Sequence, residues 1–125
     1  MKSSIIAVAL SVGGIAALSA PMTAAEAAPR RANVTVTISA QGTDMSGVVR
    51  SPRPLKCAAN RTVKLFKMVN GQPHLFTTDT TSLQGGKWVW SSGNTGQEGR
   101  FFAKVARKPG CKADVSRTIQ VRRNP

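Results

Sequence analysis

Hydrophobic and polar residues alternate with a period of two through most of the chain beyond residue 33. Val34, Val36 and Ile38, for example, are separated by Thr35 and Thr37. Successive side chains of a β-strand point to opposite faces, so this alternation predicts strands with one buried face. On this pattern we expect seven strands, at residues 34–38, 45–49, 61–68, 74–79, 87–90, 100–106 and 116–121.

Turn-forming residues separate these segments. Asn70-Gly71 is a strong hairpin signal. Residues 80–86 and 91–99 are rich in Ser, Thr and Gly, which predicts loops. The segments between them show no apolar stripe with the period of an amphipathic helix. The sequence therefore predicts an all-β domain over residues 33–122, a seven-stranded antiparallel β-sandwich.

Residues 1–27 have the three parts of a secretory signal peptide. A positively charged start precedes an apolar run of about 16 residues, and Ala25 and Ala27 supply the small residues of a cleavage site. An uncleaved membrane helix is the alternative, but the run is shorter than the roughly 20 residues that span a bilayer. Cleavage near Ala27 leaves a basic leader at 28–32 and a short tail at 123–125. We expect a secreted protein, extracellular or associated with the cell wall, with no transmembrane span in the mature chain.

Cys57 and Cys111 are the two cysteines of the chain, and both follow the signal segment. In a secreted protein an even, small number of cysteines predicts a disulfide, and two cysteines allow one pairing. A metal or redox pair is the alternative. It is disfavoured because there is no Cys-x-x-Cys and His74 has no second histidine to join it.

Basic residues outnumber acidic ones by 18 to five, which gives a net charge of +13. Two basic groups flank the cysteines: Arg50, Arg53, Lys56 and Arg61 around Cys57, and Lys104, Arg107, Lys108 and Lys112 around Cys111. A disulfide would bring Arg53, Lys56, Lys108 and Lys112 to one end of the sandwich, because each lies within four residues of a cysteine. These four residues are the candidate polyanion-binding residues.

Such a charge attracts polyanions over a long range. Outside the cell these include teichoic acids, anionic lipid head groups, acidic polysaccharides and released DNA. The alternative is that the charge provides only solubility and non-specific adhesion. No aromatic interleaving and no nucleic-acid-binding motif accompanies the charge, so the sequence predicts no specific nucleic-acid partner.

The sequence offers little for catalysis. The chain has one histidine, His74, and no Gly-x-Ser-x-Gly motif. The carboxylates beyond the signal segment, Asp44, Asp79, Glu98 and Asp114, are far apart in the sequence, whereas a glycosidase needs two across one bond. We expect Asp79 to bond nearby backbone N–H groups; a calcium ligand is the alternative. We therefore expect no enzyme, no cofactor and no metal site.

Trp88 and Trp90 share one face of their predicted strand. Exposed, they would form a stacking platform for sugar rings or bases. Because the domain has few other large hydrophobic residues, we expect both to belong to the core instead.

The motifs of residues 45–121 resemble those of transthyretin-like, or carboxypeptidase regulatory-like, β-sandwich modules of secreted bacterial proteins. In order they are Met45-Ser-Gly-Val-Val49, Cys57, Arg61-Thr-Val-Lys-Leu65, Thr78-Asp-Thr-Thr81, Gly86-Lys-Trp88, Gly99-Arg-Phe-Phe-Ala-Lys-Val105, Cys111, Ser116 and Ile119-Gln-Val121. Immunoglobulin-like sandwiches have similar turns, so the topology stays open between the two. The resemblance implies a scaffold or adhesive role with no catalytic residues.

Two functions are compatible with these observations. The first is a secreted, cationic, non-enzymatic protein that binds anionic polymers of the cell envelope or the extracellular space. The alternative is a protein-binding module, such as a secreted inhibitor or an adhesin, which uses an exposed loop at residues 80–86 or 91–99.

Overall fold

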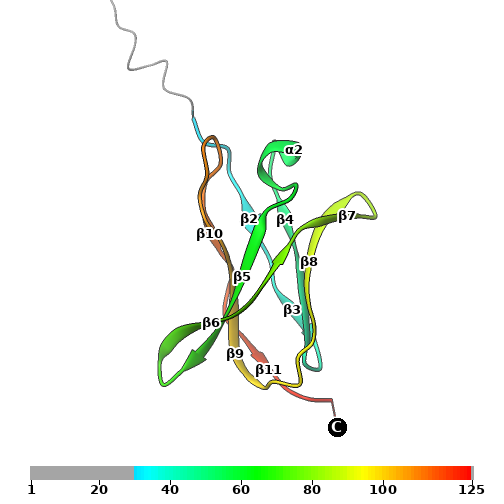
Figure 1. The fold of residues 1–125 in the computed structure, drawn as a ribbon, viewed down its shortest axis with the longest axis vertical. Helices are drawn as coiled ribbons and strands as arrows, with labels where there is room; N and C mark the ends of the chain where they lie inside the picture. The colour runs from blue at the N-terminus through cyan, green and yellow to red at the C-terminus, as the bar shows by residue number, and fades with distance from the viewer. Residues whose placement is uncertain (1–29, 125) are drawn as a thin grey trace, which may run out of the picture. The chain divides into compact units, whose positions relative to one another are not determined.

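The structure, a computed structural model, describes residues 30–124. The predicted signal peptide, the start of the basic leader and Pro125 lie outside these residues. One sheet contains β2 (Thr35–Val36), β3 (Ser39–Gln41), β4 (Asp44–Arg50), β8 (Lys87–Asn94) and β7 (Ser82–Gln84). The other contains β10 (Asp114–Val115), β11 (Ile119–Val121), β9 (Gly99–Val105), β5 (Thr62–Val69) and β6 (Gln72–Thr80). One short helix, α2 (Pro54–Cys57), connects β4 to β5 (Figure 1).

All strand pairs within the two sheets are antiparallel, which confirms the predicted all-β fold class. The first sheet has the order β2/β3, β4, β8, β7, and the second has the order β10/β11, β9, β5, β6. With β6 as strand C′ and β7 as strand D, these orders correspond to A-B-E-D and G-F-C-C′. This is the arrangement of immunoglobulin-like sandwiches, one of the two expected topologies. Among the described residues, no helix has the length and apolar character required to cross a membrane.

The prediction of seven strands is wrong, because residues 30–124 contain ten. The first predicted strand, residues 34–38, contains only β2, and β3 begins after it at Ser39, beyond a break at Thr37. There the Thr37 carbonyl oxygen accepts a hydrogen bond from Nε1 of Trp90 at 2.9 Å, and the Thr37 hydroxyl accepts the bond of the Val48 N–H at 2.9 Å. Gly47 allows this approach, because a Cβ atom at that position would lie 1.9 Å from the Thr37 carbonyl oxygen. The Thr37 hydroxyl thus takes the place of a backbone carbonyl group as the acceptor for Val48, and the hydrogen-bond pattern between the first strand and β4 is interrupted there.

The last predicted strand, residues 116–121, contains only β11, and β10 ends before it at Val115. Near the break, the Ser116 hydroxyl accepts a hydrogen bond from the Ala103 N–H at 2.8 Å. The third additional strand, β7, lies within residues 80–86, where a loop was expected, and pairs with β8. The predicted loop at 91–99 is also shorter than expected, because β8 continues to Asn94.

The chain changes sheets at Thr81, the single residue between β6 and β7. Thr81 is buried, and its hydroxyl donates to the Ala58 carbonyl oxygen at 2.6 Å and accepts from the Arg61 N–H at 2.9 Å. These two hydrogen bonds hold the connection between the sheets against the segment between α2 and β5.

Apolar side chains from both sheets meet between the layers. The largest of the fully buried ones are Trp90, Phe101, Met45, Leu65 and Val49. The prediction that the tryptophans belong to the core is confirmed for Trp90, which is 1% exposed. Trp88 packs against the core but stays half-buried.

Candidate functional site

A disulfide between Cys57 and Cys111 joins α2 to the loop between β9 and β10. The two Cα atoms are 5.5 Å apart, and both residues are fully buried. The predicted pairing is therefore confirmed. Because the two cysteines are 54 positions apart in the sequence, the bond fixes segments that the chain alone would leave free to separate.

Local sequence explains how each cysteine reaches this position. Pro54 lies in the first turn of α2, where the missing N–H needs no partner, and the single helical turn places Cys57 against the core. On the other side, the Cys111 N–H donates to the Lys108 carbonyl oxygen at 2.9 Å and closes a turn through Pro109 and Gly110. Gly110 has a φ of +82°, which suits glycine in the third position of such a turn.

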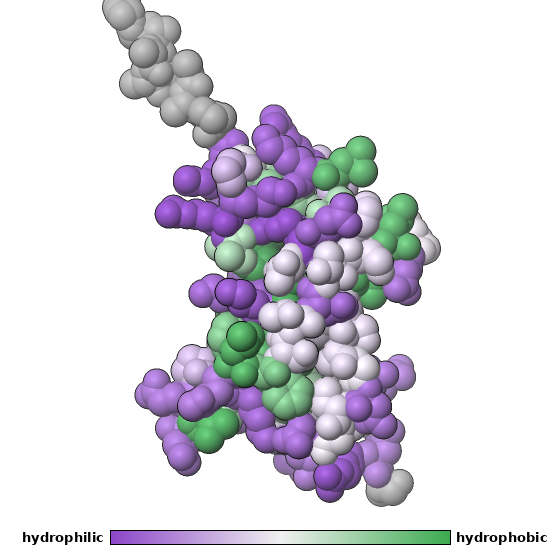
Figure 2. Space-filling model, in the orientation of Figure 1, coloured by the Kyte–Doolittle hydropathy of each residue, from purple (hydrophilic) through white to green (hydrophobic). Residues whose placement is uncertain are grey.

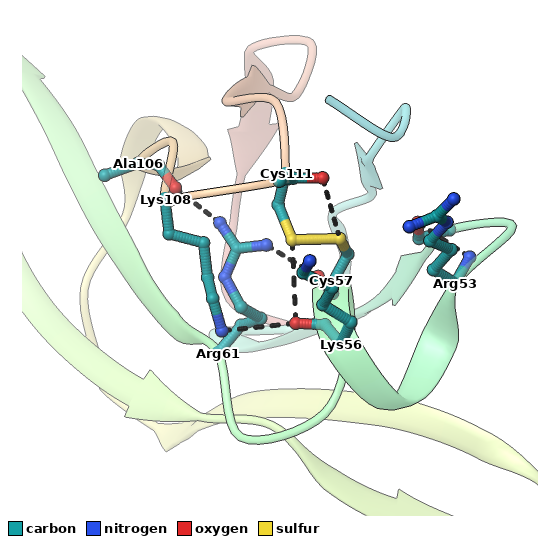
Figure 3. Close-up of a disulfide and its surroundings, with 9 residues drawn as sticks. Arg53, Lys56, Cys57, Arg61, Ala106, Lys108 and Cys111 are labelled. Atoms are coloured by element: carbon teal, nitrogen blue, oxygen red, sulfur yellow. Dashed lines mark hydrogen bonds between the residues drawn. A yellow bond between two sulfur atoms is a disulfide. The ribbon is translucent and has the colours of Figure 1, made fainter. Parts of the chain in front are cut away.

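Arg61 lies behind the disulfide and is 5% exposed. Its Nη1 donates to the Cys57 carbonyl oxygen at 2.6 Å, and its Nη2 donates to the Ala106 carbonyl oxygen (Figure 3). Burial lowers the pKa of the Arg61 guanidinium, because the charged form loses hydration. The guanidinium thus joins the two loops that the disulfide links. It cannot contribute to the exposed cations around Cys57, although the sequence places it in that group.

Lys56 and Lys108 come into contact beside the disulfide (Figure 3). Nζ of Lys108 donates to the Lys56 carbonyl oxygen at 3.1 Å. The Lys56 side chain lies across the turn, since a Cβ atom on Gly110 would be 2.6 Å from its Nζ. Both side chains are exposed, so two ammonium groups lie on one small surface.

Lys112 extends this surface toward the start of the domain. Its N–H donates to the Ala32 carbonyl oxygen at 2.9 Å, and the Ala32 N–H donates to the Gly110 carbonyl oxygen at 2.8 Å. An isolated bridge therefore pairs Ala32 with Cys111, within the segment expected as a leader, and Arg31 lies next to the Lys112 side of the site.

Arg53 belongs to the same end of the sandwich but lies apart from the lysines. It precedes α2, and its guanidinium points away from the disulfide (Figure 3). The structure thus brings all four predicted residues to one end but places only Lys56 and Lys108 in direct contact. We call Lys56, Lys108 and Lys112 the lysine cluster.

Acidic side chains serve other parts of the fold. Asp79 accepts a hydrogen bond from the Ser91 N–H at 2.7 Å, Asp114 from the Val36 N–H at 2.8 Å, and Glu98 from the Arg123 N–H at 2.8 Å. Asp79 therefore bonds a backbone N–H group, as expected, although across the crossover between sheets rather than locally. Within residues 30–124, no three His, Cys, Asp or Glu side chains group closely enough to hold a metal ion.

Neither protein families nor characterised proteins match this sequence in comparison. The resemblance to transthyretin-like modules therefore stays a prediction from the motifs.

Proposed function

We propose that this chain is a secreted, non-enzymatic β-sandwich protein that binds anionic polymers of the cell envelope or extracellular space at its disulfide end. The apolar N-terminal run supports export. The buried disulfide is compatible with an oxidising extracellular compartment.

The contact between Lys56 and Lys108 carries the proposal. Lys108 is bound to a backbone carbonyl group, which does not neutralise its charge. Asp114, two residues from Lys112, is directed to the Val36 N–H. The hydrogen bond to the Lys56 backbone keeps the Lys108 ammonium group on the same small surface as the Lys56 side chain. Like charges that share a surface repel one another, and a bound polyanion relieves the repulsion. Since the disulfide already fixes both loops, little backbone ordering is needed on binding.

The affinity for heparin and for a purified teichoic acid, measured at several salt concentrations, tests this proposal. The variant Lys56→Glu/Lys112→Glu leaves the Lys108 hydrogen bond in place. We expect it to weaken binding at least tenfold and to reduce the slope of log K against log[salt] by about 1–2, because each lost cation contact removes about 0.7–0.9.

Arg117→Glu/Arg122→Glu is the matched control, since it changes the net charge equally at exposed positions away from the lysine cluster. Arg31 is unsuitable as a control because Ala32 pairs beside Lys112. Equal losses for the two variants would show that the charge acts only in bulk and would refute the proposed site.

A second candidate function, binding of a protein partner, is favoured by apolar surface near α2. Leu55 is 83% exposed and Leu83, in the segment expected as a binding loop, is 59% exposed. Between their elements lies a pocket of about 260 Å³ lined by Pro54, Trp88 and neighbouring residues. A protein interface here should keep most of its affinity between about 50 mM and 200 mM salt, whereas polyanion binding should fall steeply.

A further inference from the structure

The outer face of the second sheet carries a continuous row of apolar side chains. Along β5 and β9, Leu65 and Ala103 point into the core, so the alternate residues Phe66 and Phe102 point outward. These two phenylalanines are direct cross-strand partners on the two central strands. Leu75, which is 55% exposed, pairs with Phe66 on the other side and extends the row onto β6.

The two phenylalanine rings stack on one another. Their centroids are 5.2 Å apart, and the planes differ by 13°. Neither ring is fully buried, so part of the pair faces solvent. Figure 2 shows apolar surface where β5, β6 and β9 meet in Figure 1, between strongly hydrophilic zones.

Cations border this aromatic row on both sides. Lys64 and Lys104 are direct cross-strand partners and lie one row above the phenylalanines on the same face. Arg100 is exposed and lies two residues before Phe102, one row below them. Like charges directly opposite one another destabilise a sheet, so the Lys64–Lys104 pair has no evident benefit for folding.

No carboxylate of the described residues lies on this face. Asp79 and Asp114 pair with Val63 and Val105, whose side chains point into the core, so both carboxylates belong to the inner side. Asp44 belongs to the other sheet, and Glu98 precedes β9 at its lower end. A second copy of the chain would set the same cations against themselves. The face is therefore complementary to an anionic partner that also has flat rings.

We propose that this face, Phe66 and Phe102 with Lys64, Lys104 and Arg100, binds single-stranded nucleic acid without sequence preference. Each nucleotide carries a flat aromatic ring and one negative charge, so one polymer satisfies both features of the face. Bases stack on the exposed part of the phenylalanine pair, and phosphates contact the flanking cations. Aromatic residues on adjacent central strands of a sheet are an established way to present such a stacking surface. An acidic polysaccharide provides the charge but no aromatic ring.

The inference is independent of the proposed function at the disulfide end. Its test compares binding of a twelve-residue oligothymidylate with an abasic oligomer of the same length and charge. We expect the intact, disulfide-bonded protein to bind the oligothymidylate roughly 5- to 100-fold more tightly, the range that stacking of one base on an aromatic residue supports.

Phe66→Leu/Phe102→Leu keeps the row apolar and should abolish this ratio while leaving heparin affinity unchanged. Lys64→Gln/Lys104→Gln should weaken binding of both oligomers. The matched variant Lys56→Gln/Lys112→Gln should weaken heparin binding and preserve the ratio. Melting temperatures confirm that each variant is folded.

Equal affinity for the two oligomers, or a ratio that survives in the phenylalanine variant, would overturn the inference whatever happens to heparin binding. The inference would also be overturned if the wild-type protein were a dimer and Phe66→Leu/Phe102→Leu were a monomer, because the face would then serve self-association. Loss of heparin binding alone in the lysine-cluster variant bears only on the disulfide end.

Discussion

At one end of the sandwich, a disulfide and the buried Arg61 join α2 to the loop between β9 and β10. At the other end, the uncharged Thr43 joins the β3–β4 turn to the loop that follows β8. Thr43 is buried between β3 and β4. Its hydroxyl bonds to the Asn94 side chain and accepts from the Gly96 N–H at 3.1 Å. Its carbonyl oxygen accepts from the Thr95 hydroxyl at 3.0 Å. Each end thus holds two neighbouring loops together, but with different chemical groups.

The two ends also differ in how the charges of the bonding side chains are compensated. At the disulfide end, cationic side chains of Arg61 and Lys108 satisfy backbone carbonyl groups, which leaves their charge uncompensated. At the opposite end, most of these bonds come from uncharged hydroxyl groups. One cation takes part there, since Nη2 of Arg123 donates to the Gly96 carbonyl oxygen at 2.9 Å, but the same residue's N–H donates to the carboxylate of Glu98. Positive charge at the disulfide end is therefore partly a result of how that end is held together.

Removal of the disulfide should have the largest effect on this comparison. We expect Cys57→Ser/Cys111→Ser to lower the free energy of unfolding by about 2–4 kcal/mol, since a loop of this length confers about 4 kcal/mol in the chain-entropy account. Urea denaturation measures the loss, and thiol titration of the denatured, unreduced wild type should find no free thiol. A loss below about 1 kcal/mol would mean that Arg61 holds this end without the covalent bond.

Arg61→Met should come next, because it keeps the apolar stem but leaves the carbonyl groups of Cys57 and Ala106 without their donor. We expect a loss of about 2–3 kcal/mol, the usual value for hydrogen bonds from a charged group. Urea denaturation in the oxidised state is the measurement. Arg61→Lys can donate to fewer acceptors, so its free energy of unfolding should lie between those of the wild type and Arg61→Met. Wild-type stability of Arg61→Met would show that water replaces the guanidinium.

Thr43→Val should have the smallest effect of the three. The substitution keeps the side-chain shape but removes the hydroxyl from Asn94 and the Gly96 N–H, which should cost about 1–2 kcal/mol. Thermal unfolding measures it, with Thr95→Val as a control that loses bonds at a less buried position. If Thr43→Val cost as much as the disulfide, the two ends would be equally important despite their different chemistry.

The fold class and the disulfide were predictable because each depends on a pattern within the sequence: alternation for the strands, and cysteine number for the bond. The breaks at Thr37 and Ser116 were not, since each replaces a ladder bond with a hydroxyl group directed at a strand that only the fold brings near. The strand β7 was missed because a three-residue edge strand depends on β8 for its pairing.

The candidate site was predictable in part. Proximity to Cys57 and Cys111 located the four basic residues, because a disulfide is a distance restraint. The burial of Arg61 was missed, since one of its acceptors, Ala106, lies 45 residues away in the sequence. The partnership of Phe66 with Phe102 was missed for a similar reason: the strand register, not the local sequence, makes them neighbours.

The broken edge strands have a consequence for aggregation. A long, regular edge offers unpaired N–H and C=O groups on which another chain can add a strand. Here β2/β3 and β10/β11 are each interrupted, β7 has three residues, and β6 carries Pro73, which lacks an N–H, and an irregular register. No edge of the described sheets is therefore a long, uninterrupted template for cross-β growth, so we expect the fold to resist polymerisation even at high concentration.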